Sequence, residues 1–491
     1  MLRTSSRLSQ AARFVSACRH ASTSDAAFRL IDPLPNTAQV GQVAPPTERK
    51  LSEFNNGIYV AATTSNSPLC TVNIVVKAGS RYELPGEEGL AHFMRRLAYK
   101  STDKHTAIYM TCLPQWYGMK LSCTGTRESI VYSGTCLKDD VDNMLDVMCQ
   151  TIVAPKIYNW EVHYTPAEHD GLTARLIDAR QRVAQDNGGL VNNRAGSVIN
   201  ALQNHAFRGG LSQSVFCPDH RVGNVDEEHC VAYHKRRYLG SNIGVFAAGV
   251  HPDDLVTSVT RHGLYNLPKG DPLTQQAQGA SKFTTGNYES RIQTGDSTVI
   301  AGLVGQGASL TDEKQHISSL LFQRMLGSNA PLESGVSTSR LQVAADKAVG
   351  STASAPPTVS SLNINFSDAG LFGMQVEAGK SEIRDVLKAA TAEFTRASSG
   401  VTEKELKMAK AQLKADLAET QESHAGIVED MAYQVMYRGG KYLVPEKVAE
   451  RVEAVTLKDV KSFAQSVVQS KHVLVQHGNL NEAPHLDELG L

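Results

Sequence analysis

The chain has 491 residues, of which 41% are hydrophobic and 20% are charged, and its formal net charge at pH 7 is -1. Hydrophobic cores stop growing near about 250 to 300 residues, so a chain of this length is expected to fold as two domains or more. The near-neutral charge gives no electrostatic reason to expect nucleic acid or an anionic membrane surface as the main partner. The longest apolar runs, such as Val72 to Val76, are strand-sized and far shorter than the roughly 20 residues of a membrane-spanning helix.

Residues 1–24 differ from the rest of the chain in composition. They contain four arginines, many serines and no acidic residue. On a helix, Leu8 and Val15 would share one face, while Arg3 and Arg7 would lie elsewhere. A basic amphipathic segment without an apolar core is typical of a mitochondrial transit peptide and not of a secretory signal. We therefore predict a mitochondrial presequence over residues 1–24 and a polar lead-in over residues 25–50.

The rest of the chain divides at a polar stretch near its middle. Residues 266–296 are rich in Gln, Gly, Ser and Thr and contain two prolines, a composition typical of a linker. We therefore predict an N-terminal domain over residues 51–265 and a C-terminal domain over residues 297–491.

The two predicted domains repeat one order of elements. Each has a strand that ends in glycine, a helix after an acidic turn, a strand-rich piece, an amphipathic helix, a long helical region and a closing strand. The paired segments are Cys70 to Ser80 and Ser297 to Gly307, Glu87 to Tyr99 and Asp312 to Leu326, Leu121 to Leu137 and Leu362 to Ala378, Asp139 to Val153 and Ser381 to Ser398, and Asn242 to Val250 and His472 to His477. This pattern predicts a duplicated unit of roughly 200 residues. Because adjacent strand-rich runs are not separated by crossover helices, the predicted class is α+β, with a largely antiparallel sheet in each unit.

The first helix of the first unit carries the most informative motif. In an inverted zinc-peptidase motif, H-x-x-E-H, two histidines on one helical face bind zinc and the glutamate activates water. Here the sequence is His92-Phe-Met-Arg95-Arg96, so Arg95 stands at the glutamate position and Arg96 at the second histidine position. Arginine stays protonated and has no lone pair to offer, so neither residue can bind zinc or act as a base.

These substitutions predict that positions 92, 95 and 96 form no catalytic, metal-binding or cofactor-binding site, because a catalytic zinc needs three protein ligands. We interpret His92 as a partly buried helix histidine. Two alternatives stand for Arg95 and Arg96. They make salt bridges or face solvent, or they occupy the former metal cavity and pair with carboxylates there.

The stretch Val76-Lys-Ala-Gly-Ser-Arg-Tyr-Glu83, followed by Gly89-x-Ala-His92-Phe and Ala98-Tyr-Lys100, resembles the mitochondrial processing peptidase and pitrilysin-type family. The similarity runs from about position 50 to the C-terminus and implies two homologous pitrilysin-type domains. Active members of the family take a third zinc ligand, a glutamate, from a helix roughly 75 residues farther on. The corresponding region, Thr165 to Arg182, offers Glu168 and Asp170 but no clear ligand motif.

Within the family, three stretches are similar to the core subunits of the mitochondrial cytochrome bc1 complex: Cys217 to Gly223, Phe366 to Gly373, and Gly478-Asn-Leu480. The resemblance implies a non-catalytic structural subunit, peripheral to the inner membrane on its matrix side, that supports assembly and stability of a dimeric complex. The implied partners are the paralogous core protein 1, cytochrome b, cytochrome c1, the Rieske iron-sulfur protein and small subunits. The chain lacks the organised Cys or His sets that haem or iron-sulfur ligation requires, so the redox centres are expected in those partners and no cofactor is expected here.

Two other functions compete with this one. The chain could be the non-catalytic, substrate-binding subunit of a processing peptidase, a subunit family that has a long glycine-rich loop near positions 326–341. That segment contains only Gly327 and Gly335 here, which favours the structural subunit. The other competitor, a zinc protease, lacks two required positions.

Weaker candidates lie elsewhere. Cys230 and His234, with Glu227 nearby, have a spacing that could hold a metal, but no fourth ligand is evident. Three glycines between positions 302 and 307 hint at a phosphate loop that no Lys-Ser or Lys-Thr completes. The eight cysteines contain no CxxC pair, and Cys18 falls in the presequence, so the other seven are expected to be free thiols.

Overall fold

The structure is a computed structural model that describes residues 49–163, 178–270, 280–284, 286–327, 339–349 and 356–490. The predicted presequence, nearly all of the lead-in, and most of the segments that contain Glu168, Asp170 and Gly335 lie outside these residues. Among the described residues, no helix combines the length and the apolar content needed to cross a bilayer.

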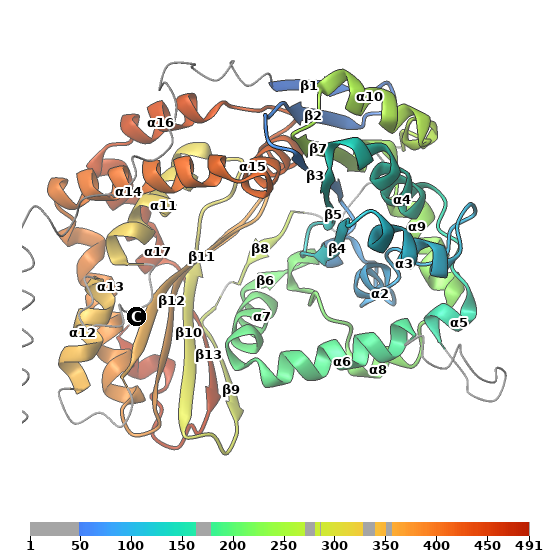
Figure 1. Cartoon of the computed structure of the whole chain (residues 1–491). Coiled ribbons are helices and arrows are strands. Elements are labelled where there is room, and N and C mark those ends of the chain that lie inside the picture. The colour runs from blue at the N-terminus through green and yellow to red at the C-terminus, as the bar shows by residue number, and fades with distance from the viewer. Residues whose placement is uncertain are drawn as a thin grey trace, which may run out of the picture. The chain divides into compact units, whose positions relative to one another are not determined.

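The first half of the chain alternates strands and helices (Figure 1). Its elements are β1 (Arg49–Glu53), β2 (Tyr59–Thr63), β3 (Leu69–Val76), α2 (Leu90–Arg96), α3 (Ala107–Trp116), β4 (Lys120–Gly125), β5 (Ile130–Leu137), α4 (Val141–Val153), α5 (Asn159–Val162), α6 (Ala179–Asn192), α7 (Arg194–Ala206), β6 (Phe207–Arg208), α8 (Asp219–Val222), α9 (Glu227–Arg237), β7 (Ile243–Ala248) and α10 (Pro252–Arg261).

The second half follows a similar order. Its elements are β8 (Lys282–Phe283), β9 (Tyr288–Gln293), β10 (Thr298–Gln306), α11 (Glu313–Leu326), α12 (Arg340–Val349), β11 (Thr358–Asn365), β12 (Gly370–Gly379), α13 (Ile383–Gly400), α14 (Glu403–Glu422), α15 (His424–Tyr437), α16 (Pro445–Ala454), α17 (Leu457–Gln469) and β13 (Val473–Gly478). Thr402 and Glu405 form a capping box at the start of α14.

The two main sheets share one topology. Read from β4, the first sheet runs β4-β5-β3-β7-β2 and then adds β1, and the second runs β11-β12-β10-β13-β9. In each sheet one neighbouring pair is parallel, β2 with β7 and β13 with β9, and the other pairs are antiparallel. The predicted class, two α+β units with largely antiparallel sheets, is confirmed.

The position of a strand in its sheet explains its pattern of apolar and polar residues. The central strands β3 and β10 are covered on both faces, so nearly all of their residues are buried and they read as continuous apolar runs. By contrast, β5 alternates buried and half-buried residues. The edge strand β9, with the sequence Tyr-Glu-Ser-Arg-Ile-Gln, lies inside the stretch that we interpreted as a linker. A half-exposed edge strand needs few apolar residues, which is why composition alone assigned these residues to a linker.

Each main sheet is covered on one face by a helix from the other half (Figure 1). Helix α7 of the first half places Val198 and Leu202 against Ile300 and Val304 of β10. In return, α15 of the second half packs Val428, Met431 and their neighbours against Val75 of β3 and Phe246 of β7. A buried aliphatic side chain contributes about 1.5 to 3 kcal/mol, so this exchange of helices ties the two halves into one folding unit.

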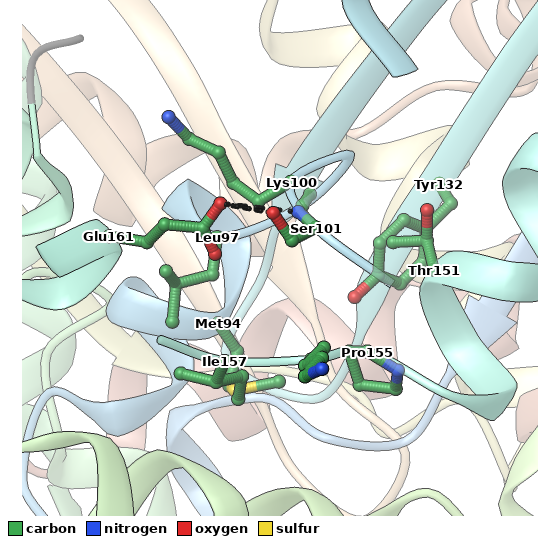
Figure 2. Close-up of a pocket in the computed structure, with 11 residues that line it drawn as sticks. Met94, Leu97, Lys100, Ser101, Tyr132, Thr151, Pro155, Ile157 and Glu161 are labelled. Atoms are coloured by element: carbon green, nitrogen blue, oxygen red, sulfur yellow. Dashed lines mark hydrogen bonds between the residues drawn. The ribbon is translucent and has the colours of Figure 1, made fainter. Parts of the chain in front are cut away.

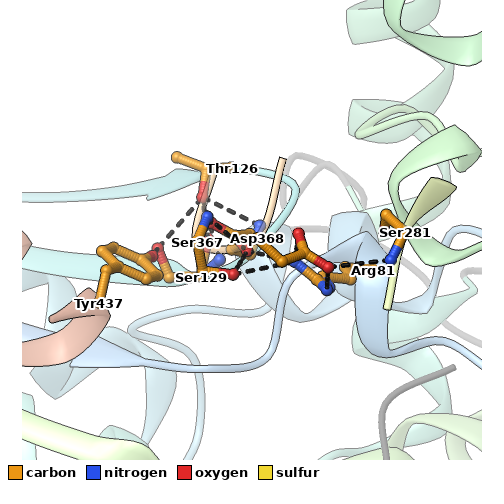
Figure 3. Close-up of polar contacts among 8 residues, drawn as sticks. Arg81, Thr126, Ser129, Ser281, Ser367, Asp368 and Tyr437 are labelled. Carbon is orange, nitrogen blue, oxygen red and sulfur yellow. Dashed lines mark hydrogen bonds and ion pairs between the residues drawn. The ribbon is translucent and has the colours of Figure 1, made fainter. Parts of the chain in front are cut away.

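A buried ion network also joins the halves (Figure 3). Arg81, which follows β3, donates to Glu128 at 2.6 Å and to both carboxylate oxygens of Asp368, at 2.8 and 2.5 Å. The Ser367 hydroxyl donates to Glu128 at 2.5 Å, and the Ser281 backbone N–H donates to Asp368 at 2.9 Å. These carboxylates lie at loops that face each other across the joint, where a charge without a partner would be destabilising.

Candidate functional site

The helix that carries the degenerate motif, α2, is held at its N-terminus by two unusual contacts. Gly89 precedes it with φ +88°, and a Cβ there would lie 2.3 Å from the sulfur of Cys217, so only glycine fits. The buried carboxyl of Glu83 accepts from the N–H groups of Gly89 at 3.0 Å and Ala91 at 2.7 Å, which caps the helix. Burial raises the pKa of Glu83 to about 8, and the charges of Glu88 and Glu87 act in the same direction.

His92 is buried, with 1% of its surface exposed, so the expected partly buried histidine is in fact fully enclosed. Its Nδ1 accepts from the backbone N–H of Cys217 at 3.1 Å, and its Nε2 lies 2.8 Å from Asp186 Oδ2. Burial, together with the charge of Arg95, lowers the pKa of His92 to about 4, so the ring is neutral at pH 7. A neutral ring whose Nδ1 accepts must carry its proton on Nε2. His92 therefore donates to Asp186 and has no lone pair left for a metal.

Both arginines of the motif point at the same carboxylate. Arg95 Nη2 donates to Asp186 Oδ2 at 2.8 Å, and Arg96 Nε donates to the same oxygen at 2.6 Å. Arg96 Nη2 also contacts Oδ1. Both arginines therefore make salt bridges, and their shared partner is a carboxylate beside His92.

The charge balance of this cluster is the reverse of that at a zinc site. One carboxylate faces two guanidinium groups and a neutral imidazole, so the cluster of His92, Arg95, Arg96 and Asp186 carries a net positive charge. Burial opposes ionisation of Asp186, but hydrogen bonds from Arg96 and His92 outweigh it and hold the pKa of this carboxyl below its usual value. Burial lowers the pKa of Arg95, against the pull of Asp186. We refer to these four residues as the arginine clamp.

The zinc ion implied by the motif does not fit these residues. Arg95 and Arg96 bring fixed positive charge to the two positions that would have to supply the base and the second ligand. Asp186, the carboxylate in reach of His92, already accepts from all three side chains. Among the described residues, no group of three or more His, Cys, Asp and Glu side chains has an arrangement that could hold a metal ion.

Asp186 was not among the residues singled out from the sequence. It lies on α6, four positions beyond the region in which a third ligand was sought, and Glu168 and Asp170 of that region lie outside the described residues. The start of helix α6 was the sequence signal that pointed towards Asp186. Asp178 caps α6 through its side chain, and a carboxylate two turns inside that helix could have been considered.

A small pocket lies behind α2, lined by Met94, Leu97, Tyr132, Pro155 and their neighbours (Figure 2). Glu161 closes one side, where its Oε1 accepts from the Ser101 hydroxyl at 2.7 Å. The cavity measures about 10 Å³, which is room for about one water molecule. It cannot receive a peptide side chain.

The weaker candidates do not assemble into sites. His234 donates its Nε2 proton to the carbonyl of Ile152 at 2.9 Å, and Cys230 is buried in the core of the first half. Gly302 and Gly305 lie within β10, where they allow α7 and α17 to pack closely. The seven described cysteines are free thiols, as predicted.

Residues 59–219 match the family model described as Insulinase (Peptidase family M16), and residues 224–413 match the model described as Peptidase M16 inactive domain. Cytochrome b-c1 complex subunit 2 of Homo sapiens is 28% identical over 455 residues, which cover 92% of this chain and 94% of that protein. The Rattus norvegicus protein of the same name is 27% identical, with 93% and 95% covered. A probable mitochondrial-processing peptidase subunit alpha-1 of Arabidopsis thaliana is 22% identical, with 90% and 84% covered.

Proposed function

The chain belongs to peptidase family M16, whose two domain models it matches in order, and from this premise we propose that it is not a peptidase. We propose instead that it is core protein 2, a structural core subunit of the mitochondrial ubiquinol-cytochrome c reductase complex. It would lie on the matrix side of the inner membrane, peripheral to it, and support the assembly and stability of the complex.

The observation that carries the non-catalytic part is the arginine clamp. A peptidase of this type needs a carboxylate to activate water at position 95 and an imidazole to bind zinc at position 96. Arg95 and Arg96 supply neither, and His92 directs its Nε2 proton at Asp186. No step of peptide hydrolysis can be assigned to these side chains.

Full-length similarity supports the structural part. The relatives named as cytochrome b-c1 complex subunit 2 align along nearly their whole length as well as along this chain. The basic segment over residues 1–24 supports import into mitochondria. By analogy, the partners would be core protein 1, cytochrome b, cytochrome c1, the Rieske iron-sulfur protein and small subunits.

The mechanical role agrees with how the described part of the chain is built. The exchanged helices and the buried network around Arg81 join the two halves of the described chain. Helix α3 exposes Ile108 and Trp116, with 69% and 70% of their surfaces accessible, next to Tyr109 and Tyr117. Exposed aromatic and aliphatic side chains of this kind are enriched where proteins meet, which supports a subunit that works by contact.

A second candidate, the substrate-binding subunit of a processing peptidase, is favoured by the similarity to an alpha subunit. Purification of the chain together with its partners distinguishes the two functions. Inner membranes are solubilised in mild detergent, and the tagged full-length chain is isolated with whatever it binds. We expect co-purification with haem absorbance of b and c1 cytochromes in a fixed ratio, and no cleavage of a presequence peptide.

Recovery of a zinc-bearing partner without cytochromes, together with presequence cleavage by the pair, would support the second candidate and contradict the first. Metal analysis of the isolated chain tests the non-catalytic assignment separately. Stoichiometric zinc that disappears in His92→Ala would contradict the absence of a metal site, whichever partners are found.

A further inference from the structure

Two thiols lie side by side on neighbouring strands of the first sheet. Cys70 on β3 and Cys136 on β5 are direct partners in the antiparallel register, and their sulfur atoms lie 3.3 Å apart. Register partners in antiparallel strands have Cα atoms about 4.5 to 5.5 Å apart, within the range that a disulfide spans. Closing the sulfur gap therefore needs side-chain adjustment and no movement of the strands past each other.

We propose that Cys70 and Cys136 are a redox modification site, at which a hydroperoxide converts the two thiols into a reversible disulfide between β3 and β5.

The reaction balances with hydrogen peroxide as the oxidant. Cys70 attacks as its thiolate, the peroxide O–O bond breaks, the departing hydroxide takes a proton to become water, and Cys70 becomes a sulfenic acid. The sulfur of Cys136 then attacks the sulfenic sulfur, the S–O bond breaks, and a second water leaves with the Cys136 proton. Two thiols lose two electrons and two protons, and one peroxide is reduced to two waters.

The order of attack follows from the environment of each thiol. The hydrogen bond that Cys70 shares with Cys136 lowers the pKa of the Cys70 thiol, and the charge of Lys138 acts in the same direction against the effect of burial. The same hydrogen bond and burial raise the pKa of the Cys136 thiol. Cys70 is thus the better nucleophile toward peroxide, and Cys136 is the resolving thiol.

Both sulfur atoms are buried, yet they lie at the open end of the ladder. The neighbouring residues Leu69 and Leu137 are 47% and 49% exposed. Beyond them, the Lys138 N–H donates to the Pro68 carbonyl at 3.1 Å, and proline has no N–H with which to return the bond. This end of the pair can open locally without unfolding the sheet.

A surface pocket reaches the same place. It measures about 250 Å³ and is lined by Lys138, Val141, Gly249 and neighbouring residues of α10. Gly249 packs closely on Cys70, because a Cβ at Gly249 would lie 3.3 Å from the Cβ of Cys70. The pocket therefore adjoins the strand that carries Cys70, and we expect peroxide to reach the two thiols from this side when the end of the strand pair opens.

The disulfide would join residues 66 positions apart at the point where β5 leads into α4. Cross-links that close long loops restrict the unfolded chain, so oxidation is expected to raise the melting temperature of the chain and a thiol reductant is expected to reverse the shift.

The test uses the full-length chain in whatever assembly it purifies with, treated with hydrogen peroxide. Free thiols are blocked with a light maleimide, disulfides are reduced, released thiols are labelled with a heavy maleimide, and each cysteine is read by mass spectrometry. We expect heavy label at Cys70 and Cys136 together, and a cross-linked peptide pair before reduction. In Cys136→Ser we expect dimedone to trap Cys70 as its sulfenic acid, whereas Cys230→Ser, a matched buried thiol, should leave the cross-link intact.

The partly exposed Cys112 reports that peroxide has reacted. Oxidation of Cys112 while Cys70 and Cys136 both carry the light label would overturn the proposal. So would over-oxidation of Cys70 in the wild-type chain with Cys136 still free.

Discussion

The arginine clamp yields a prediction whose size can be worked from the contacts. Asp186→Asn keeps the shape of the side chain and removes its charge. The clamp then holds two guanidinium groups with no counter-charge, and the new amide N–H groups face donors. Removal of one partner from a buried ion pair costs about 3 to 5 kcal/mol. The Asp186 carboxylate accepts from Arg95, Arg96 and His92, and these side chains range from buried to one-third exposed, so the low end of that range applies. We expect a loss of about 3 kcal/mol in the free energy of unfolding.

Urea denaturation and thermal melting of the full-length chain measure this loss. A change of about 3 kcal/mol corresponds to a decrease of roughly 3 to 4 °C in Tm for one folding unit of about 400 residues. Asp253→Asn is the control, because its ion pair with Lys50 is exposed on both sides and such pairs contribute less than about 1 kcal/mol.

A double-mutant cycle with Arg96→Gln separates charge pairing from packing. If the carboxylate acts through its charge, the double variant loses less than the sum of the single variants. Asp186→Asn with the stability of Asp253→Asn, or strict additivity with Arg96→Gln, would refute the reasoning.

Three further predictions follow from other contacts. Burial lowers the pKa values of the histidines His92, His234 and His316 to about 4. These pKa values lie below the ordinary value of 6.5 for histidine, so protonation favours the unfolded chain. The free energy of unfolding is therefore at its full value above about pH 6.5 and decreases as the pH falls towards 4. Urea titrations between pH 6 and pH 5 should show that each histidine adds about 1.4 kcal/mol per pH unit to the slope of unfolding free energy against pH. His316→Gln should reduce this slope by about 1.4 kcal/mol per pH unit, and an unchanged slope contradicts the assignment. Arg81→Met leaves Glu128 and Asp368 without their cation and should lower the free energy of unfolding by about 3 to 4 kcal/mol, whereas Arg396→Met, whose side chain is 74% exposed, should change it by less than about 1 kcal/mol; equal effects in urea denaturation would argue against a buried joint. Leu202→Ala should cost about 2 to 4 kcal/mol, and because Leu202 packs on the second sheet, amide hydrogen exchange should increase in β10 and β13, while faster exchange confined to the first sheet would contradict the exchange of helices.

The repeated order of elements was predictable because strand and helix periods are local properties of the sequence. The exchange of α7 and α15 was not, since an amphipathic helix shows that it has a buried face and does not show which sheet it covers. Edge strand β9 was missed for a related reason. With one neighbour in the sheet, its burial pattern is weak, and its polar residues match linker composition.

The features of the site also fall into those that the sequence predicts and those that it does not. The loss of zinc chemistry follows from the identity of two side chains, because arginine cannot bind a metal in any conformation. The partner of those arginines depends on where α6 runs, and only the three-dimensional path of the chain brings Asp186 to α2.

The stretches that carried the family resemblance turn out to be contact points. Gly79-Ser-Arg81 meets Ser367-Asp368 at the joint between the halves, and Cys217 packs against Gly89 while its N–H fixes the ring of His92. These motif residues therefore make contacts that hold the fold, apart from any catalytic role.

The arginine clamp also fixes the path of the chain between the two halves. Asp186 anchors α6 to α2, and α6 runs through the single residue Asn193 into α7, the helix that crosses to the second sheet. The guanidinium groups of Arg95 and Arg96 hold this anchor from the side of α2. Apolar side chains at positions 95 and 96 would leave the half-buried Asp186 carboxylate with only the Nε2 proton of His92, at a cost that the paired arrangement avoids.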